Sequence, residues 1–142
     1  ETSLEDSFGE LAKKVLNTNM KALAETYSLL DEKVVSQTVD ILHAAERIWF
    51  FGVGASLLVA LKAANKFLRI EPKVYCVQDT HTQAMIAATM RPGEAAVVFS
   101  YSGATKDSIH VAELAKHEGD LYHAFRQVTV DRFCGSCAVV RF

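Results

Sequence analysis

Residues 47–56 constrain the fold most, because an apolar run passes there into a glycine turn and then at once into a helical pattern. The run 47–51 (RIWFF) is aromatic and β-branched, as expected of a strand that is buried on both faces. The turn 52–56 (GVGAS) follows, and apolar residues recur at helical spacing from Leu57 onward. This order of strand, turn and helix is typical of an α/β fold.

The same alternation continues along the chain. Residues 73–77 and 95–99 are further β-favouring runs, and helical patterns cover 57–68, 82–90 and 104–117. We therefore predict a doubly wound α/β domain, a three-layer sandwich with a mostly parallel sheet and right-handed crossovers. In such sheets ligands bind beyond the carboxyl ends of the strands, near the point where the strand order reverses.

Helical spacing also marks the N-terminal part. Apolar residues recur over 4–30, which predicts a long amphipathic helix, and Asp31 has the position of an N-cap for a second helix over 34–42. We assign residues 1–45 to a helical segment for packing or assembly, and residues 46–142 to the α/β domain. The long helix packs either on a partner subunit or on its own core.

Charge and composition exclude several classes of function. The chain has 15 Lys and Arg against 17 Asp and Glu, a net charge of -2, so it has no basic surplus to hold DNA or a membrane surface. It has no apolar stretch near the ~20 residues of a membrane span and no signal peptide, so we expect a cytoplasmic protein. Its three cysteines do not form a disulfide framework, and we expect no metal or cofactor. The first residue is not methionine, which suggests a segment of a longer protein.

A second polar turn lies at residues 100–105 (SYSGAT), directly between a strand and a helix start. Backbone N–H groups from Gly103 onward, with the hydroxyls of Ser100, Ser102 and Thr105, would form a concave nest of neutral donors. A phosphate monoester has the oxygens to accept these bonds. The alternative is that the Ser and Thr side chains only cap the helix.

The first turn offers the same chemistry. Gly52 and Gly54 let the backbone approach a ligand closely, and the Ser56 hydroxyl adds a side-chain donor. A helix dipole favours negative charge at such a turn. One turn of this kind is often a plain connection, but two in one α/β unit predict a phosphate site shared between them.

Catalysis would need a base as well as these donors. Moving a proton between neighbouring sugar carbons requires a Glu or His at the site, and the candidates by position are His81, His110 and Glu113. His81 follows the second strand and can touch a ligand at the mouth of the crevice; otherwise its ring faces water at a helix start. His110 and Glu113 lie about one turn apart, as on a solvated helix face. Because the hydroxyls have no base partner in sequence, we predict binding and no catalytic residue.

Residues 52–56 (GVGAS) and 100–105 (SYSGAT), with 79–83 (DTHTQ) between them, resemble the sugar isomerase (SIS) domain. More narrowly they are similar to the C-terminal effector domain of RpiR-type bacterial transcription regulators, over about Leu23 to Ala115. The resemblance implies a sensor that binds a sugar phosphate, assembles as a homodimer or homotetramer, and acts on DNA through a helix-turn-helix domain that precedes this segment. The alternatives are a sugar-phosphate aldose-ketose isomerase and a fragment that serves only for assembly. The hydroxyls that would hold the phosphate belong to Ser56, Ser100, Ser102 and Thr105.

The C-terminal tail, residues 117–142, departs from the family pattern. An SIS domain would continue with a fourth strand, a Thr-containing turn, a Ser-Pro-Leu segment and a fifth strand. One hypothesis is that the tail is translated in a shifted frame from about Asp120, which DNA sequencing across the junction would test. Residues 128–130 and 138–140 are β-favouring and can add short strands. The C-x-x-C spacing at 134–137 has no second pair, so we interpret it as free thiols.

Overall fold

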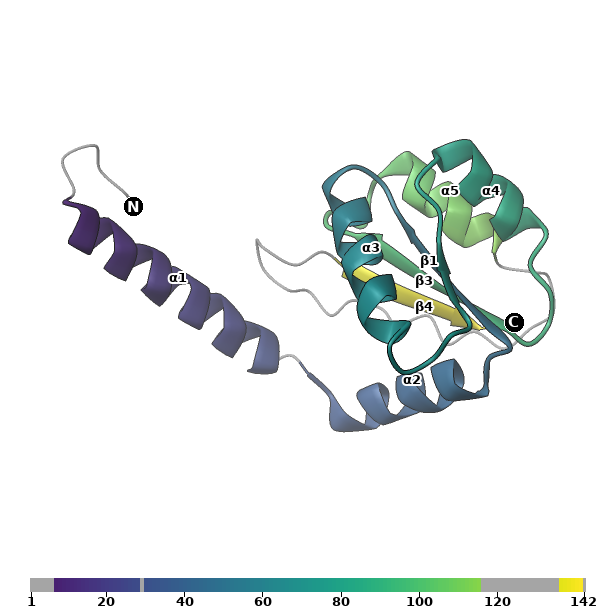
Figure 1. The fold of residues 1–142 in the computed structure, drawn as a ribbon, viewed down its shortest axis with the longest axis horizontal. Helices are drawn as coiled ribbons and strands as arrows, with labels where there is room; N and C mark the ends of the chain where they lie inside the picture. Colours follow the sequence, from purple (N-terminus) through teal and green to yellow (C-terminus); the bar gives the residue numbers. More distant parts are fainter. Residues whose placement is uncertain (1–6, 29, 116–135, 142) are drawn as a thin grey trace.

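The computed structural model describes residues 7–28, 30–115 and 136–141. The chain alternates helices and strands in the order that the sequence predicts from residue 47 onward (Figure 1). The elements are α1 (Phe8–Ser28), α2 (Glu32–Ala44), β1 (Arg47–Gly52), α3 (Ala55–Phe67), β2 (Val74–Cys76), α4 (Thr80–Ala88), β3 (Glu94–Ser100), α5 (Lys106–Leu114) and β4 (Ser136–Arg141).

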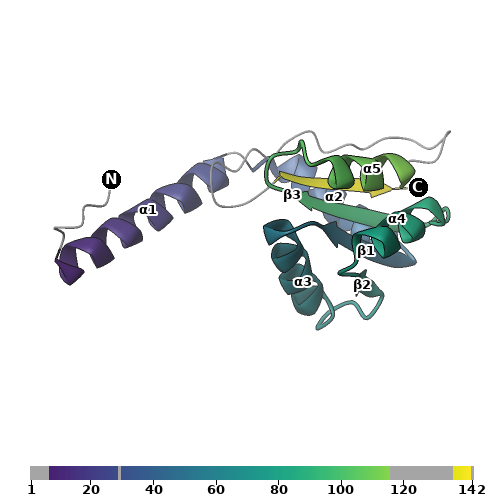
Figure 2. The ribbon, with the colours of Figure 1, turned by 90° about the horizontal axis from the view of Figure 1, so that it is seen from above.

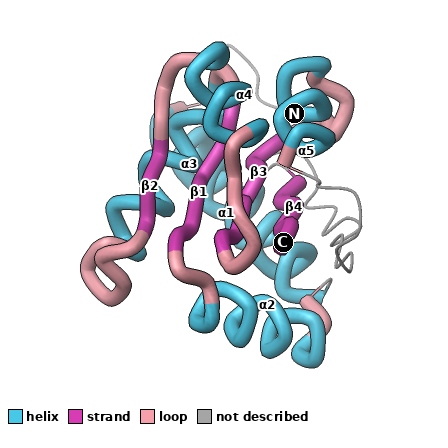
Figure 3. Tube along the Cα trace, turned by 90° about the vertical axis from the view of Figure 1, so that its right-hand side faces the viewer, coloured by secondary structure: helices cyan, strands magenta, loops and turns pink. Residues whose placement is uncertain are grey.

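The strands form one sheet in the order β2-β1-β3-β4 (Figure 3). β1 pairs in parallel with β2 and with β3, so that Phe50 lies opposite Cys76 on one side and Val97 on the other. The chain therefore passes from β1 outward to β2 and returns to β3 on the far side of β1. The strand order reverses between β1 and β3, which confirms the predicted doubly wound fold.

Helices cover both faces of the sheet (Figure 2). On one face Ile48 and Phe50 of β1 pack with residues of α3 and with Ile41 of α2. On the other face Phe51 of β1 packs with Ala87 near the end of α4 and with α5. Because successive strand residues point to opposite faces, a continuous apolar run fills two cores at once, as predicted for a strand buried on both sides.

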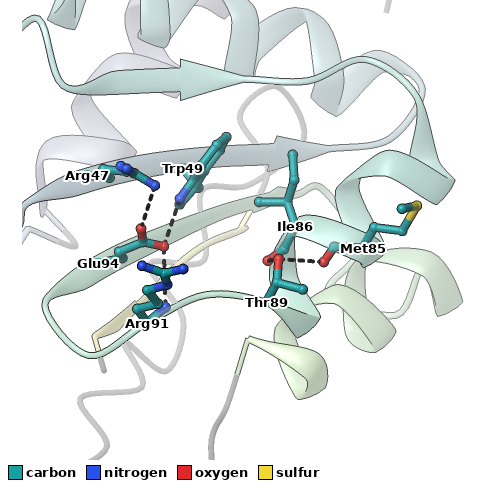
Figure 4. Close-up of polar contacts among 7 residues, drawn as sticks. All are labelled: Arg47, Trp49, Met85, Ile86, Thr89, Arg91 and Glu94. Carbon is teal, nitrogen blue, oxygen red and sulfur yellow. Dashed lines mark hydrogen bonds and ion pairs between the residues drawn. The ribbon is translucent and has the colours of Figure 1, made fainter.

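A buried carboxylate holds the amino ends of β1 and β3 together (Figure 4). Glu94, which is 5% exposed, pairs with Arg47 at 3.2 Å and accepts a hydrogen bond from Trp49 Nε1 at 3.2 Å. It also accepts a weaker bond from the backbone N–H of Arg91 at 3.4 Å. A buried charge is tolerated only when its oxygens have partners, and here they do. This cluster lies at the opposite end of the strands from the two glycine turns.

The helix α1 extends away from the α/β domain (Figures 1 and 2) and has no buried residue. It begins after Ser7, whose N–H donates to Glu10 Oε2 at 2.9 Å while Glu10 N–H reaches Ser7 Oγ at 3.4 Å, as in a capping box. The predicted start at Leu4 lies outside the described residues. Asp31 caps α2 as predicted, since it accepts from the N–H groups of Lys33 and Val34. No helix in the described parts of the chain has the length and hydrophobicity needed to span a membrane.

The strand predicted at residues 138–140 is confirmed as part of β4, which pairs with β3. The pairing is antiparallel, with Val97 opposite Val139. β4 is therefore the strand next to β3 on the side away from β1. Residues 117–135, with the predicted strand 128–130 and the first cysteine of the C-x-x-C pair, lie outside the described residues.

Candidate functional site

The two glycine turns lie side by side at one edge of the sheet. Gly52 at the end of β1 is paired with Phe99 near the end of β3, and the two strands run in the same direction. Neighbouring strands lie about 4.8 Å apart, so the turns that follow them leave the sheet next to each other. Both turns are also at the point where the strand order reverses, as the sequence predicts.

The first turn needs both of its glycines, for different reasons. A Cβ on Gly52 would lie 2.8 Å from the backbone oxygen of Ser56, so only glycine lets α3 start this close to β1. Gly54 has φ +57° and ψ -127°, a conformation that residues with a side chain rarely adopt, and a Cβ there would meet nothing within 4 Å. The space beside Gly54 is therefore open to a ligand.

Ser56 lies in the first turn of α3 and is half-buried. Its hydroxyl makes no hydrogen bond to another described residue, so it can donate to a ligand. The backbone N–H of Ser56 is bonded to Val53 at 3.1 Å, and that of Leu57 to Gly54 at 3.1 Å. The backbone N–H of Ala55, the first residue of α3, has no partner in the described chain.

In the second turn part of the predicted donor set is used internally. Ser100 is 7% exposed and its Oγ accepts from the N–H of Gly103 at 3.1 Å. Ser102 Oγ accepts from the N–H of Ala104 at 3.1 Å and lies 3.4 Å from Thr105 Oγ1. The N–H groups of Gly103 and Ala104 are thus bonded within the turn, whereas we expected them to face a ligand. The reason is that the residue at φ +65°, Gly103, folds the turn back onto its own serines.

The serine hydroxyls of this turn can still donate hydrogen bonds. An oxygen that accepts a backbone N–H still has an O–H to offer, so Ser100 and Ser102 can both act as donors. Thr105 precedes α5 as its N-cap residue but makes no side-chain capping bond. The N–H groups of the first turn of α5, from Lys106 to Ser108, have no partner among the described residues.

Among the described residues after residue 30, the four helices differ in how their N-termini are capped. Asp31 caps α2, and Asp79 caps α4 by accepting from Thr82 N–H at 2.8 Å. α3 and α5 begin instead at Gly54 and Thr105, with no side-chain cap. Two helix N-termini with open N–H groups and positive dipole ends therefore meet at the same edge, which is the arrangement that binds an anion.

The pKa of Asp79 is lowered from its usual 3.8, first by the backbone N–H of Thr82, then by its hydroxyl, with a smaller contribution from the charge of His81. The carboxylate is therefore kept ionised at the start of α4. His81 is exposed in the first turn of this helix, which follows β2 and so begins at the same edge as the glycine turns. No hydrogen bond or ion pair within the described residues joins His81 to either turn.

The other candidate bases lie beyond the first turn of α5. His110 and Glu113 are exposed on this helix, and no hydrogen bond joins either of them to a serine of the site among the described residues. In the part of the chain that the structure describes, no hydrogen bond joins a hydroxyl of the two turns to a candidate base, whereas both turns offer hydroxyls and open N–H groups at the same edge of the sheet. Such a set of donors can bind an oxyanion.

Gln83 contributes to this edge although the sequence analysis did not select it. It is 1% exposed, and its Nε2 donates to the carbonyl of Gly52 at 2.9 Å and to that of Val77 at 2.8 Å. The available signal was a polar residue at a core position, because Gln83 lies one turn before Ala87 on the buried side of α4, which ends at Ala88 and not at residue 90 as predicted.

Comparison with known proteins places the chain in a family. Residues 41–122 match the family model described as the SIS domain. The chain therefore belongs to the SIS domain family, as its two turns and the residues between them indicated.

Several relatives are transcription regulators. The chain is 39% identical over 107 residues to the HTH-type transcriptional regulator HexR of Pseudomonas aeruginosa, covering 75% of this chain and 38% of HexR. It is 36% identical over 115 residues to an uncharacterized HTH-type transcriptional regulator of Caldanaerobacter subterraneus subsp. tengcongensis, covering 81% of this chain and 41% of that protein. It thus spans about two fifths of the length of these relatives.

A solved structure shares the fold. The Vibrio vulnificus NanR protein, complexed with ManNAc-6P, superimposes with a TM-score of 0.69 and 35% sequence identity, covering 76% of this chain and 41% of the NanR chain. The α/β core described above therefore has the same fold as the matched part of NanR.

Proposed function

We propose that this chain is the effector domain of a bacterial RpiR-type transcription regulator and that it senses a sugar phosphate. The observation that carries the proposal is the pair of uncapped helix N-termini, α3 and α5, beside each other where the strand order reverses. The similarity to HTH-type regulators, and to NanR in complex with ManNAc-6P, supports a sugar phosphate rather than another anion.

In this proposal the phosphate group lies between the two turns. The open space beside the Gly54 backbone lets the phosphate group approach closely, and the hydroxyls of the two turns donate hydrogen bonds to the phosphate oxygens. Two positive helix ends offset its charge, so the turns themselves need no cationic side chain. Beyond the phosphate, His81 would meet the sugar. The residues that we assign to the site are Gly52, Gly54, Ser56, His81, Ser100, Ser102, Gly103 and Thr105.

The domain would act as a sensor through differential affinity. A sugar phosphate that binds one arrangement of subunits or domains more tightly shifts the population toward it, and so changes DNA binding by a helix-turn-helix domain elsewhere in the full-length protein. We propose binding without turnover, because no hydrogen bond joins His81, His110 or Glu113 to a hydroxyl of the two turns among the described residues.

Assembly is the second part of the proposal. Residues 1–45 would serve a homodimer or homotetramer, since α1 has no buried residue and exposes an apolar side with Phe8, Leu23 and Tyr27 at 87%, 70% and 78%. An isolated helix of this length is marginal in water, so a covered face would stabilise it. We place the assembled protein in the cytoplasm, where a transcription regulator works.

Ligand-induced thermal shifts test the binding site. The chain is incubated with ManNAc-6P, glucose 6-phosphate, fructose 6-phosphate and ribose 5-phosphate, and both the melting temperature and sugar turnover are measured. A ligand at about 100 times its Kd raises stability by about 2.7 kcal/mol. Turnover of any of these sugars would instead favour the isomerase.

The double variant Ser56→Ala, Ser102→Ala should lose the shift, because each hydroxyl donates a charge-assisted bond that contributes about 1.5–3 kcal/mol. The control is Ser36→Ala, on the exposed surface of α2. A double variant that binds as tightly as the control would show that the phosphate lies elsewhere.

A further inference from the structure

Gln83 connects two segments that strand pairing leaves apart. Pairing between β1 and β2 ends at Phe50 and Cys76, whereas β1 continues beside β3 as far as Gly52. Past this point the amide of Gln83 bridges the carbonyl of Gly52, at the end of β1, and that of Val77, one residue beyond β2. The side chain thus joins the first glycine turn to the loop that follows β2.

The geometry of this bridge is fully determined. Both partners of Gln83 are carbonyl oxygens, at 2.9 and 2.8 Å, so the amide nitrogen must face them, and its two N–H groups are both used. Because Gln83 is 1% exposed, water cannot replace either bond without opening the core.

Nothing else in the described chain makes this connection through a side chain. Asp79, the other polar group that shapes this loop, bonds to Thr82 and therefore fixes the start of α4 but not its distance from β1. The loop 77–79 leads into the first turn of α4, which carries His81 at the edge where the glycine turns lie. Ala87 packs α4 on Phe51 of β1, and Gln83 adds the hydrogen bonds that tie the start of this helix, and with it His81, to the first turn.

We propose that Gln83 is a positioning residue for the ligand: it holds residues 77–82, which are the loop after β2 and the first turn of α4 with His81, at a set distance from the phosphate turn. This inference rests on the proposed function. A phosphate alone would touch only the two glycine turns, whereas a sugar phosphate reaches past them to a neighbouring loop. Gln83 therefore sets how the sugar is bound and leaves the binding of the phosphate group largely unchanged.

The variant Gln83→Met tests this, because methionine keeps the length of the side chain and removes both N–H groups. Affinity is measured by calorimetry for inorganic phosphate and for the tightest binder among glucose 6-phosphate, fructose 6-phosphate and ribose 5-phosphate. We expect the sugar phosphate to bind about tenfold more weakly and inorganic phosphate less than about threefold more weakly, since only the former needs the aligned loop. His81→Ala should weaken sugar phosphate binding in the wild-type background and have no further effect in Gln83→Met.

The matched control is Gln37→Met on the exposed surface of α2, which should change neither affinity. Equal weakening of both ligands in Gln83→Met, or no weakening, would overturn the inference while leaving the proposed function intact. A wild-type chain that binds no sugar phosphate would overturn the proposed function itself.

If Gln83→Met does not fold, an NMR titration of the wild-type protein tests whether Gln83 positions the ligand. Adding the sugar phosphate should shift the side-chain amide signals of Gln83 together with the backbone amide of His81, and inorganic phosphate should shift neither. Signals of Gln83 that stay unchanged on saturation with the sugar phosphate would contradict a positioning role.

Discussion

Replacing Gly52 by alanine tests the steric basis of the first turn. The added Cβ would lie 2.8 Å from the oxygen and 2.9 Å from the carbonyl carbon of Ser56, and 3.0 Å from the nitrogen of Leu57. All three are backbone atoms in the first turn of α3, so no flexible side chain can move aside. To restore ordinary contact, the start of α3 must move away from β1 by at least about 0.6 Å.

This movement has a calculable cost. Overpacking a well-packed site costs about 1–3 kcal/mol, and the upper part of that range applies when the clash is with backbone. For a chain of this size, about 3 kcal/mol corresponds to a melting temperature lower by about 10 °C. The shift of α3 also displaces Ser56 and the N–H of Ala55, so binding of a sugar phosphate should be lost as well.

The assay is thermal unfolding followed by circular dichroism, with two other glycine positions as controls. Gly9→Ala in α1 meets nothing within 4 Å and should be neutral or more stable by up to about 1 kcal/mol, because alanine favours a helix. Gly54→Ala also meets nothing but must adopt φ +57° with ψ -127°, so it should cost about 1–3 kcal/mol through backbone strain alone. A Gly52→Ala protein that melts at the wild-type temperature would refute the steric argument.

Two further predictions concern pH and assembly. The pKa of Asp79 is lower in the folded chain than its usual 3.8, so its cap adds stability above about pH 4, and this stability is lost as the pH falls through the lowered value. The difference in melting temperature between wild type and Asp79→Ala should therefore be largest at neutral pH and shrink in acid; a difference that is constant down to pH 2 would contradict this. Leu23→Glu on the apolar side of α1 should reduce the mass found by sedimentation toward 15.6 kDa, whereas Asn17→Glu on the polar side should not. An unchanged mass for Leu23→Glu would exclude this side of α1 as the assembly surface.

Local patterns were sufficient to predict most of the elements. The apolar runs at β1 and β3 are continuous because both faces of these strands are covered, and Asp31 is an N-cap because its carboxylate reaches the N–H groups two and three residues ahead. These features depend on neighbours close in sequence. The placement of both glycine turns at one edge also followed, since parallel strands bring their carboxyl ends together.

Contacts between distant residues were not predictable in the same way. Gln83 bonds to Gly52, 31 residues earlier, and Glu94 pairs with Arg47, 47 residues earlier. A polar residue within an apolar stripe indicates that some partner exists, but not which one. The direction of β4 was equally open, because a short β-favouring run can pair with an edge strand in either orientation.

The sequence alone determined the class of the fold: strand-turn-helix units with hydroxyl-rich glycine turns define an α/β domain whose two turns lie at the carboxyl ends of its strands. Only the tertiary structure decided which donors are available. The serines of the second turn accept the N–H groups of that same turn, so the N–H groups without a partner are those in the first turn of α5. The physical reason is that a residue pattern specifies which groups can form hydrogen bonds, whereas the packed chain decides which of them are already satisfied.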